Sequence, residues 1–308
     1  MRRSCAALLL FAASTFVWSQ QPAFAQNQRP AITGIAFVRV YASDPAASAN
    51  FYGKTLGYTA SKDGSLTRYP VNDAQWIEVT PLPSPAPPTR LAAVAFTTRD
   101  VSALERYLRA HGIIIVHPLS GDPSHKGFSV HDPEGNLIMF VQQTSGPAVS
   151  GGVPSTATSR RMIHAGFVVK DAETENKFYR DLLGFKPYWH GGRADNGPTD
   201  WMSNQVPDGT DWLEYMLNIQ PNATLKTIGV MDHMSLGTAK MTDVVAALQR
   251  NHCEGPDCTA SKMGRDGKIQ LNLYDPDLTR VEFMEFQPSG KVCCSPILGK
   301  PPTEQEDR

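Results

Sequence analysis

The chain has 308 residues, of which 41% are hydrophobic, and its 29 Lys and Arg nearly balance its 30 Asp and Glu. A formal net charge of −1, without a dense basic run in the body of the chain, argues against nucleic acid or an anionic membrane surface as the partner. The composition is that of an ordinary globular protein, which leaves a small molecule as the expected partner.

The first residues have the three parts of a secretory signal peptide. Two arginines give a charged start, residues 6–17 form an apolar run, and Ala23-Phe24-Ala25 matches a cleavage site. A membrane anchor is the alternative, but the apolar run is shorter than the roughly 20 residues of a span. We therefore predict a signal peptide over residues 1–25, export to the periplasm or the extracellular space, and no membrane insertion after cleavage.

An internal repeat organises the rest of the chain. FVRVYASDPAASANFYGKTLGY at residues 37–58 matches HAGFVVKDAETENKFYRDLLGF at residues 164–185. HDPEGNLIMFVQ at 131–142 likewise matches YDPDLTRVEFME at 274–285. The length left after cleavage suits two medium domains, so we predict a duplication whose copies differ by loop insertions.

Each copy divides again into two similar halves. A strand and a helix at 33–56 resemble those at 91–111, and residues 162–183 resemble 230–251. Short extended pieces follow each helix, which predicts an α+β fold of four βαβββ modules. The predicted parts are an N-terminal domain (31–143), a flexible linker (144–160), a C-terminal domain (161–287) and a tail (288–308) with a disordered end.

The repeated FY…LG helix end and DP…RVE hairpin resemble those of the vicinal oxygen chelate superfamily. That superfamily includes glyoxalase I, bleomycin-resistance proteins and extradiol dioxygenases, and the resemblance covers residues 32–287. It implies that each pair of modules curls into a half-barrel, glyoxalase-like domain around a metal ion or a ligand.

His164 is the only polar residue in the apolar run 163–169, which is typical of a buried strand. A helix is expected to begin at Asp171 and to end at Gly184. Taken alone, such a histidine is at least as often a hydrogen-bonded core residue as a ligand.

The neighbouring module supplies partners for this histidine. His233 takes the place of His164, and Glu282 takes that of Glu214, at nearly equal spacing. In a pseudo-twofold barrel all four side chains would point into the centre and form a mixed nitrogen and oxygen site. We predict that His164, Glu214, His233 and Glu282 bind one divalent metal ion (Ni, Zn, Co, Mn or Fe), with Glu285 as a fallback ligand.

The first copy lacks most of these residues. Only Glu78 remains, because Phe37, Ala93 and Met139 stand where the second copy has His164, His233 and Glu282. We expect this domain to bind no metal and to support the other domain or shape one wall of its cavity. Its histidines are expected to be solvated or structural: His111, His117, His125 and His131.

The set of two histidines and two glutamates resembles that of glyoxalase I. This implies an isomerase or lyase in which the metal holds two vicinal substrate oxygens while Glu282 or Glu214 moves a proton. Residues 224–232, interpreted as a loop, contain no Asn and a single basic residue, Lys226, and so do not resemble the segment that grips glutathione in glyoxalase I. A glutathione adduct is therefore a poor candidate for the substrate.

Two other functions remain open. An extradiol dioxygenase would use His164, His233 and Glu282 as an iron(II) triad, but the histidine and tyrosine of that family are missing before the last hairpin, near Asn272, and Glu214 fills a position that should be open. A non-catalytic binding protein, similar to bleomycin-resistance proteins, would line its cleft with aromatic residues: Trp189, His190, Trp201, Trp212 and Tyr215.

Four cysteines follow the cleavage site, at Cys253, Cys258, Cys293 and Cys294. In an exported protein they can form disulfides with three possible connectivities, and bonds between the first two and the last two would tie the tail to the C-terminal domain. A metal site made by His252 with Cys253 and Cys258 is the less favoured alternative, because the spacing is not C-x2-C.

Overall fold

The computed structural model describes residues 28–121, 125–143 and 153–305. The predicted signal peptide, residues 1–25, lies outside the described residues, and export therefore stays a prediction. Among the described residues, no helix is both long and apolar enough to cross a membrane.

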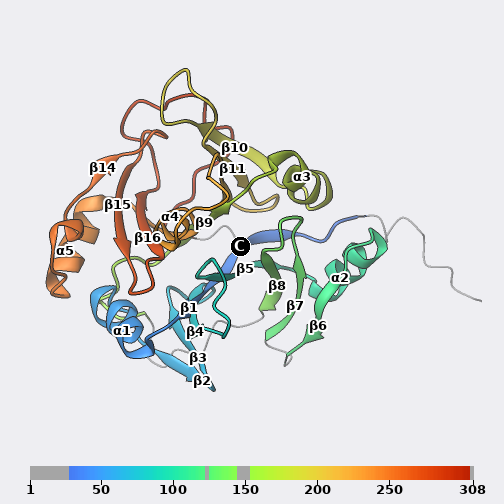
Figure 1. The fold of residues 1–308 in the computed structure, drawn as a ribbon, viewed down its shortest axis with the longest axis horizontal. Coiled ribbons are helices and arrows are strands. Elements are labelled where there is room, and N and C mark those ends of the chain that lie inside the picture. Colours follow the sequence, from blue (N-terminus) through green and yellow to red (C-terminus); the bar gives the residue numbers. More distant parts are fainter. Residues whose placement is uncertain (1–27, 122–124, 144–152, 306–308) are drawn as a thin grey trace, which may run out of the picture.

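The described chain forms two lobes, each built on a curled eight-stranded sheet (Figure 1). The elements of the first lobe are β1 (Ile32–Ala42), α1 (Pro45–Ala49), η2 (Asn50–Thr55), β2 (Ser61–Asp63), β3 (Leu66–Pro70), β4 (Trp76–Pro81), β5 (Leu91–Thr98), α2 (Val101–Ala110), β6 (Ile115–Ser120), β7 (His125–His131) and β8 (Leu137–Gln143). Its strand order is β2-β3-β4-β1-β5-β8-β7-β6, so two modules meet at the antiparallel pair β1 and β5.

The second lobe repeats this arrangement. Its elements are β9 (Met162–Val168), α3 (Ala172–Asn176), η3 (Lys177–Leu182), β10 (Lys186–Gly191), β11 (Trp201–Gln205), β12 (Trp212–Met216), α4 (Leu225–Met231), β13 (His233–Thr238), α5 (Met241–Arg250), η4 (Pro256–Cys258), β14 (Lys262–Met263), β15 (Ile269–Tyr274) and β16 (Arg280–Glu285). The order β10-β11-β12-β9-β13-β16-β15-β14 matches that of the first lobe strand for strand. The α+β fold of four βαβββ modules is therefore confirmed.

The repeated helix signals act as predicted. Asp171 accepts hydrogen bonds from the amides of Glu173 (3.1 Å) and Thr174 (3.0 Å), and Asp44 caps α1 in the same way. In the second lobe η3 ends at Leu182, and Gly184 follows its C-cap with a φ of +76°, a conformation that glycine adopts without strain. The segment η3 is π-helical. One expectation was wrong, because residues 225–231 form the short helix α4 and not a loop.

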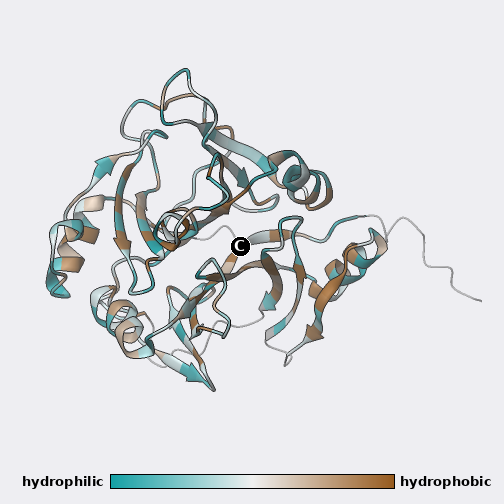
Figure 2. Ribbon diagram, in the orientation of Figure 1, coloured by the Kyte–Doolittle hydropathy of each residue, from teal (hydrophilic) through white to brown (hydrophobic). Residues whose placement is uncertain are grey.

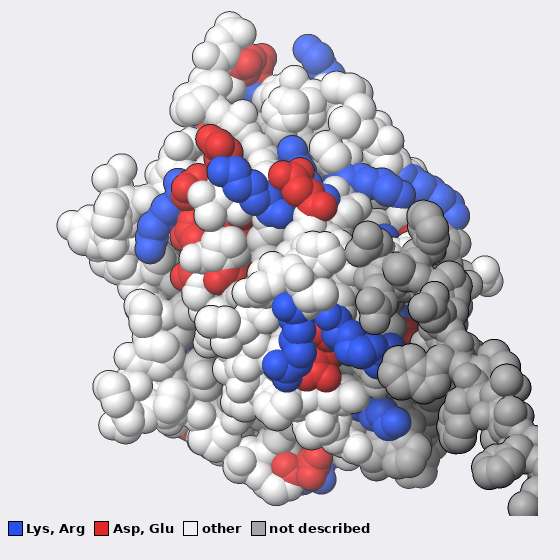
Figure 3. Space-filling model, turned by 90° about the vertical axis from the view of Figure 1, so that its right-hand side faces the viewer, with Lys and Arg blue, Asp and Glu red and all other residues white. Residues whose placement is uncertain are grey.

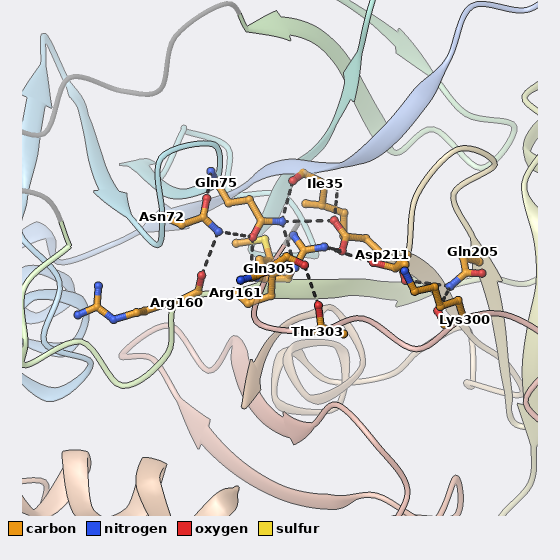
Figure 4. Close-up of polar contacts among 12 residues, drawn as sticks. Ile35, Asn72, Gln75, Arg160, Arg161, Gln205, Asp211, Lys300, Thr303 and Gln305 are labelled. Atoms are coloured by element: carbon orange, nitrogen blue, oxygen red, sulfur yellow. Dashed lines mark hydrogen bonds and ion pairs between the residues drawn. The ribbon is translucent and has the colours of Figure 1, made fainter. Parts of the chain in front are cut away.

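Two buried side chains link the lobes in a reciprocal way (Figure 4). Gln75, which precedes β4, donates to Met162 O (2.8 Å) on β9 and accepts from Met162 N (2.8 Å). Asp211, which occupies the equivalent position before β12, accepts from Ile35 N (2.8 Å) on β1. Each lobe thus binds the first strand of the other, and these hydrogen bonds fix the position of one sheet relative to the other.

The helices and hairpins exchange in the same manner. Tyr52 in η2 donates to Asp275 (2.8 Å) in the second lobe, and Tyr179 in η3 donates to Asp132 (3.0 Å) in the first. Apolar residues of both lobes form one continuous cluster. Figure 2 shows apolar and polar residues alternating along the strands, as expected when one face of a sheet is more deeply buried than the other.

Two segments that the sequence placed outside the domains pack against them. Thr158 and Ser159, in the predicted flexible linker, are buried, and Ser159 O accepts from the hydroxyl of Tyr58 (3.0 Å). The tail runs along β10, where Leu298 N donates to Tyr188 O (2.8 Å). The tail therefore contributes to the second lobe, and only residues 306–308 lie outside the described residues there.

The disulfides join neighbours in sequence, Cys253 with Cys258 and Cys293 with Cys294. The bonds expected to tie the tail to the domain are therefore not formed. The alternative metal site with His252 is excluded as well, because both of its thiols are in a disulfide.

Candidate metal centre

The predicted ligands come from four adjacent strands at the centre of the second sheet. His164 lies on β9, Glu214 on β12, His233 on β13 and Glu282 on β16. The register places Ser235 opposite both His164 and Glu282, and Gly166 opposite both His233 and Glu214. Because alternate residues of a strand share a face, the four side chains lie on one face of the sheet.

Three of the four side chains form a tight, buried cluster. His164 Nε2 lies 3.0 Å from His233 Nε2 and 3.1 Å from Glu282 Oε2, and the His233 and Glu282 atoms are 4.0 Å apart. Ligand atoms of these three residues all lie within 4.8 Å of one another. Two ligands at about 2.1 Å from one ion and at right angles to each other are about 3.0 Å apart, so the cluster fits a single ion.

The hydrogen bond of His233 fixes which of its nitrogens faces the cluster. Its Nδ1 lies 2.7 Å from Met231 O, and since a carbonyl oxygen only accepts, Nδ1 carries the proton. The Nε2 atom therefore presents a lone pair, as in histidines that bind metals. Burial lowers the pKa of His164 and of His233, which keeps both rings neutral and able to coordinate.

A glycine makes room for the His233 ring. A Cβ atom added to Gly166 would lie 2.7 Å from His233 Nδ1 and 3.0 Å from Nε2, well inside van der Waals contact. The ring of His233 therefore projects from β13 over the backbone of the neighbouring strand, β9. Only glycine at this position permits that placement.

Glu214 lies next to the triad, and its part as a fourth ligand stays a prediction. Its Oε2 is 3.6 Å from His233 Nε2, and Ser203 Oγ donates to its Oε1 over 3.3 Å. Burial raises the pKa of Glu214 to about 8, and the negative charge of Glu282 adds to the rise. Burial also opposes ionisation of Glu282, but the charge of Arg280 and the contact with His164 outweigh it and hold the pKa of Glu282 below its usual range.

A cavity of about 230 Å³ opens beside the triad. Trp212 forms one wall and stacks on His164, with ring centroids 4.6 Å apart, and Tyr188 packs against Trp212 at 5.0 Å. Trp212 pairs with His164 in the strand register and therefore lies on the same face of the sheet. Trp189 and Trp201 also line the cavity, whereas His190 and Tyr215, the other two aromatic candidates, do not.

Sequence reasoning missed the charged residues of this cavity. Lys268 is buried in its wall, and Arg280 places Nη1 3.5 Å from Glu282 Oε1. Asp266 also lines the cavity, and burial raises its pKa to about 6. Arg280 was within reach of prediction, since it lies two residues before Glu282 on the same strand and hence on the same face.

The fallback ligand lies on the other face of β16. Glu285 accepts a hydrogen bond from Met241 N (2.8 Å) at the start of α5, so it caps a helix and is excluded as a ligand. In the first lobe, His111 and His117 are exposed and bond to Tyr107 O and Ser129 Oγ. His131 is exposed as well, and the side chain of His125 lies outside the described residues.

The equivalent position in the first lobe holds an ion pair. Arg39 lies where the second lobe has Gly166, and its guanidinium bonds to Glu78 Oε2 (2.6 and 2.7 Å). Trp76 donates to the same carboxylate (2.9 Å) and stacks on Phe37 (4.9 Å), as Trp212 stacks on His164. The strand register confirms that Ala93 and Met139 stand at the places of His233 and Glu282.

The chain belongs to the Glyoxalase/Bleomycin resistance protein/Dioxygenase superfamily, which its sequence matches over residues 34–140 and 161–283. An extradiol ring-cleaving dioxygenase from B. fuscum is similar in structure, with 19% identity and a TM-score of 0.64 over 89% of this chain and 76% of that chain. Homoprotocatechuate 2,3-dioxygenase from Arthrobacter globiformis has 19% identity and a TM-score of 0.63 over 83% and 80%. No curated protein matches the sequence.

A structure of the Brevibacterium fuscum homoprotocatechuate 2,3-dioxygenase with 3,4-dihydroxyphenylacetate is also similar. It has 19% identity and a TM-score of 0.62, over 87% of this chain and 86% of that chain. At these identities the likeness establishes the fold, and the chemistry of this chain has to be argued from its own residues.

Proposed function

We propose that the chain is a metal-dependent enzyme that acts on a small substrate with two vicinal oxygens, and that it is an extradiol-type dioxygenase. The observation that carries this proposal is the cluster of two histidines and one carboxylate, which does not include Glu214. Such a triad with open positions is typical of non-haem iron(II) oxygenases. The similarity of the whole two-lobed chain to ring-cleaving dioxygenases also supports it.

When bound, an iron(II) ion would hold both substrate oxygens as a Lewis acid and supply electrons to dioxygen. The chain itself would orient the substrate by packing its ring against Trp212 and Tyr188, which line the cavity beside the triad. A bound divalent cation would lower the pKa of Glu214 from about 8. The ionised carboxylate, which faces the cavity from just outside the triad, would then receive the proton of a substrate hydroxyl. It would thus take the role for which residues 264–273 offer no histidine and for which Asn272 stands at the expected position of the tyrosine.

The size of the cavity supports a small substrate. An apolar cavity of about 150 Å³ holds one benzene molecule, so about 230 Å³ suits a single ring with short substituents. A peptide-sized thiol adduct would extend beyond this space into solvent. On the face shown in Figure 3, Lys and Arg lie beside Asp and Glu, and this distribution of charge does not argue against a small substrate.

An isomerase or lyase reaction is the second candidate. Glu214 favours it, since a carboxylate adjacent to the triad, with its Oε2 3.6 Å from His233 Nε2, is placed to move a proton between neighbouring carbons. This reaction needs no dioxygen. Oxygen consumption therefore separates the two candidates.

Metal content and oxygen uptake test the proposal. The purified chain should hold about one metal ion, which His164→Ala, His233→Ala and Glu282→Gln should lose. Glu285→Gln is the matched control, because it alters a carboxylate on the opposite face of the same strand, and it should keep the metal. Metal retained in all three ligand variants would contradict the site. A chain that folds without metal, and that chelation leaves unchanged, would be a binding protein.

Activity then distinguishes the reactions. With iron(II), a catechol should be consumed together with dioxygen in equal amounts. Turnover of a 2-oxoaldehyde adduct without oxygen uptake would instead establish the isomerase reaction and overturn the dioxygenase assignment.

We also propose that the protein is exported. The signal-like residues 1–25 support this, as do the disulfides Cys253–Cys258 and Cys293–Cys294. Amino-terminal sequencing of protein from the expressing cells should give a chain that starts at Gln26. An unprocessed chain in the cytoplasm would contradict export.

A further inference from the structure

Lys268 is the one cation of the cavity that the proposed reaction does not use and that is almost fully buried. Its residue exposure is 1%, yet its Nζ has no hydrogen-bond partner among the described residues. The ammonium lies over the rings of Trp212 (4.6 Å) and Tyr188 (5.6 Å), both of which line the cavity. A buried ammonium without an acceptor is unfavourable unless something else binds to it.

The aromatic wall connects this ammonium to the metal centre. Trp212 has its ring centroid 4.6 Å from Lys268 Nζ and 4.6 Å from the ring centroid of His164. Lys268 and Glu282 of the triad line the same cavity as Trp212, so a ligand that holds its two oxygens at the triad shares that cavity with the ammonium of Lys268. The cavity, of about 230 Å³, accommodates a single ring with a short substituent.

The charge of the cavity favours an anion at that end. Four cations line it (Lys262, Arg265, Lys268 and Arg280), against three carboxylates (Glu214, Asp266 and Glu282). Arg280 is engaged with Glu282, and Arg265 bonds to Asp195 and to Gly192 O outside the triad. A divalent ion would add to the positive excess, which leaves Lys268 as the deep, unoccupied donor.

We propose that Lys268 determines substrate specificity by binding an anionic substituent, a carboxylate in the first instance, on a single-ring substrate whose vicinal oxygens face the triad. This inference rests on the proposed function for the placement of the oxygens, but the anion site itself does not depend on the metal. A structural role is the competing explanation, in which Lys268 only offsets the charge of Asp266. The two explanations predict different responses to removing the charge.

Binding of matched ring compounds separates them. Benzoate and benzamide have the same shape and differ in charge, and both should quench the tryptophan fluorescence of the cavity. The purified chain, measured as isolated and after dialysis against a chelator, should bind benzoate roughly 10- to 100-fold more tightly than benzamide. Lys268→Met should remove this preference, and Lys268→Arg should restore part of it. Lys177→Met, at an exposed position outside the cavity lining, should leave it unchanged.

Each result decides the proposal. Equal binding of the two compounds by the unaltered chain, or a benzoate preference that survives in Lys268→Met, would overturn it. A structural role would instead lower the melting temperature of Lys268→Met and leave the ratio of the two affinities unchanged. The ratio of the two affinities is measured on the folded fraction of the protein, so the test stays valid even if the variant is less stable.

A second pair of probes isolates the proposed function. Catechol should bind to the metal-loaded chain and not to His164→Ala, and 3,4-dihydroxybenzoate should bind more tightly than catechol only while Lys268 is present. Failure of catechol to bind would refute chelation of vicinal oxygens at the triad. The benzoate result would still decide whether Lys268 binds anions.

Discussion

Replacing Gly166 by alanine tests the metal centre without touching any ligand. The new Cβ would lie 2.7 Å from His233 Nδ1 and closer still to the carbon between the ring nitrogens. Ordinary contact begins at about 3.5 Å, so the ring has to move by roughly 0.8 Å or more. The hydrogen bond from Nδ1 to Met231 O resists that movement. A metal site tolerates displacements of only about 0.5 Å.

We therefore expect Gly166→Ala to lower metal affinity by roughly 10- to 100-fold, as is common when the support of a ligand is disturbed. Affinity is measured by competition with a chromophoric chelator for Zn(II) or Fe(II). Gly53→Ala is the control, because the added Cβ meets nothing closer than 3.8 Å. Unchanged affinity in Gly166→Ala, with the fold intact by circular dichroism, would refute the placement of His233 as a ligand.

Three further measurements test the frame and the site. Gln75→Ala leaves the buried amide and carbonyl of Met162 without a partner and should lower the free energy of unfolding by about 3 kcal/mol in urea denaturation; a loss below about 1 kcal/mol would contradict the reciprocal link. Burial, with the charge of Asp132, raises the pKa of Glu175 to about 8, so the folded chain keeps a proton that the unfolded chain loses above about pH 4.3. This proton contributes stability at low pH, and the contribution is lost as the pH rises to about 8, at no more than about 1.4 kcal/mol per pH unit. Glu175→Gln should abolish this pH dependence of the free energy of unfolding. Identical pH profiles for the variant and the unaltered chain would argue against the assignment to Glu175. Chelation should lower the Tm of the unaltered chain but not that of His233→Ala, and equal shifts in both would count against the site.

The repeat made most of the fold predictable. Capping residues Asp44 and Asp171 recur at the start of both helices, and glycines recur at their ends, so the module boundaries follow from local chemistry. The short helix α4 was missed because Gly229 lowers helix propensity. Thr224, which caps that helix through Thr227 N, was the signal that would have revealed it.

The residues that escaped prediction are those whose neighbours are distant in sequence. Lys268 follows a polar turn, and lysine is almost never fully buried, so the sequence favours an exposed position. The tail was predicted as a segment outside the C-terminal domain, yet Ile297 packs against the aromatic cluster of the cavity. Both outcomes depend on how the curled sheet closes around the site, which no local pattern encodes.

A comparison of the two lobes gives a physical reason why only the second is proposed to be catalytic. In the first lobe, Glu78 at the centre of the sheet binds the guanidinium of Arg39, a cation attached to the chain. In the second, the position of Arg39 is Gly166, and the space above it holds the ring of His233 beside Glu214. Both sheets therefore place a carboxylate at their centre, where a positive charge is needed to compensate its negative charge. The first lobe satisfies it permanently, whereas in the second the proposed metal ion would supply the charge, and an ion with open positions is what a substrate could reach.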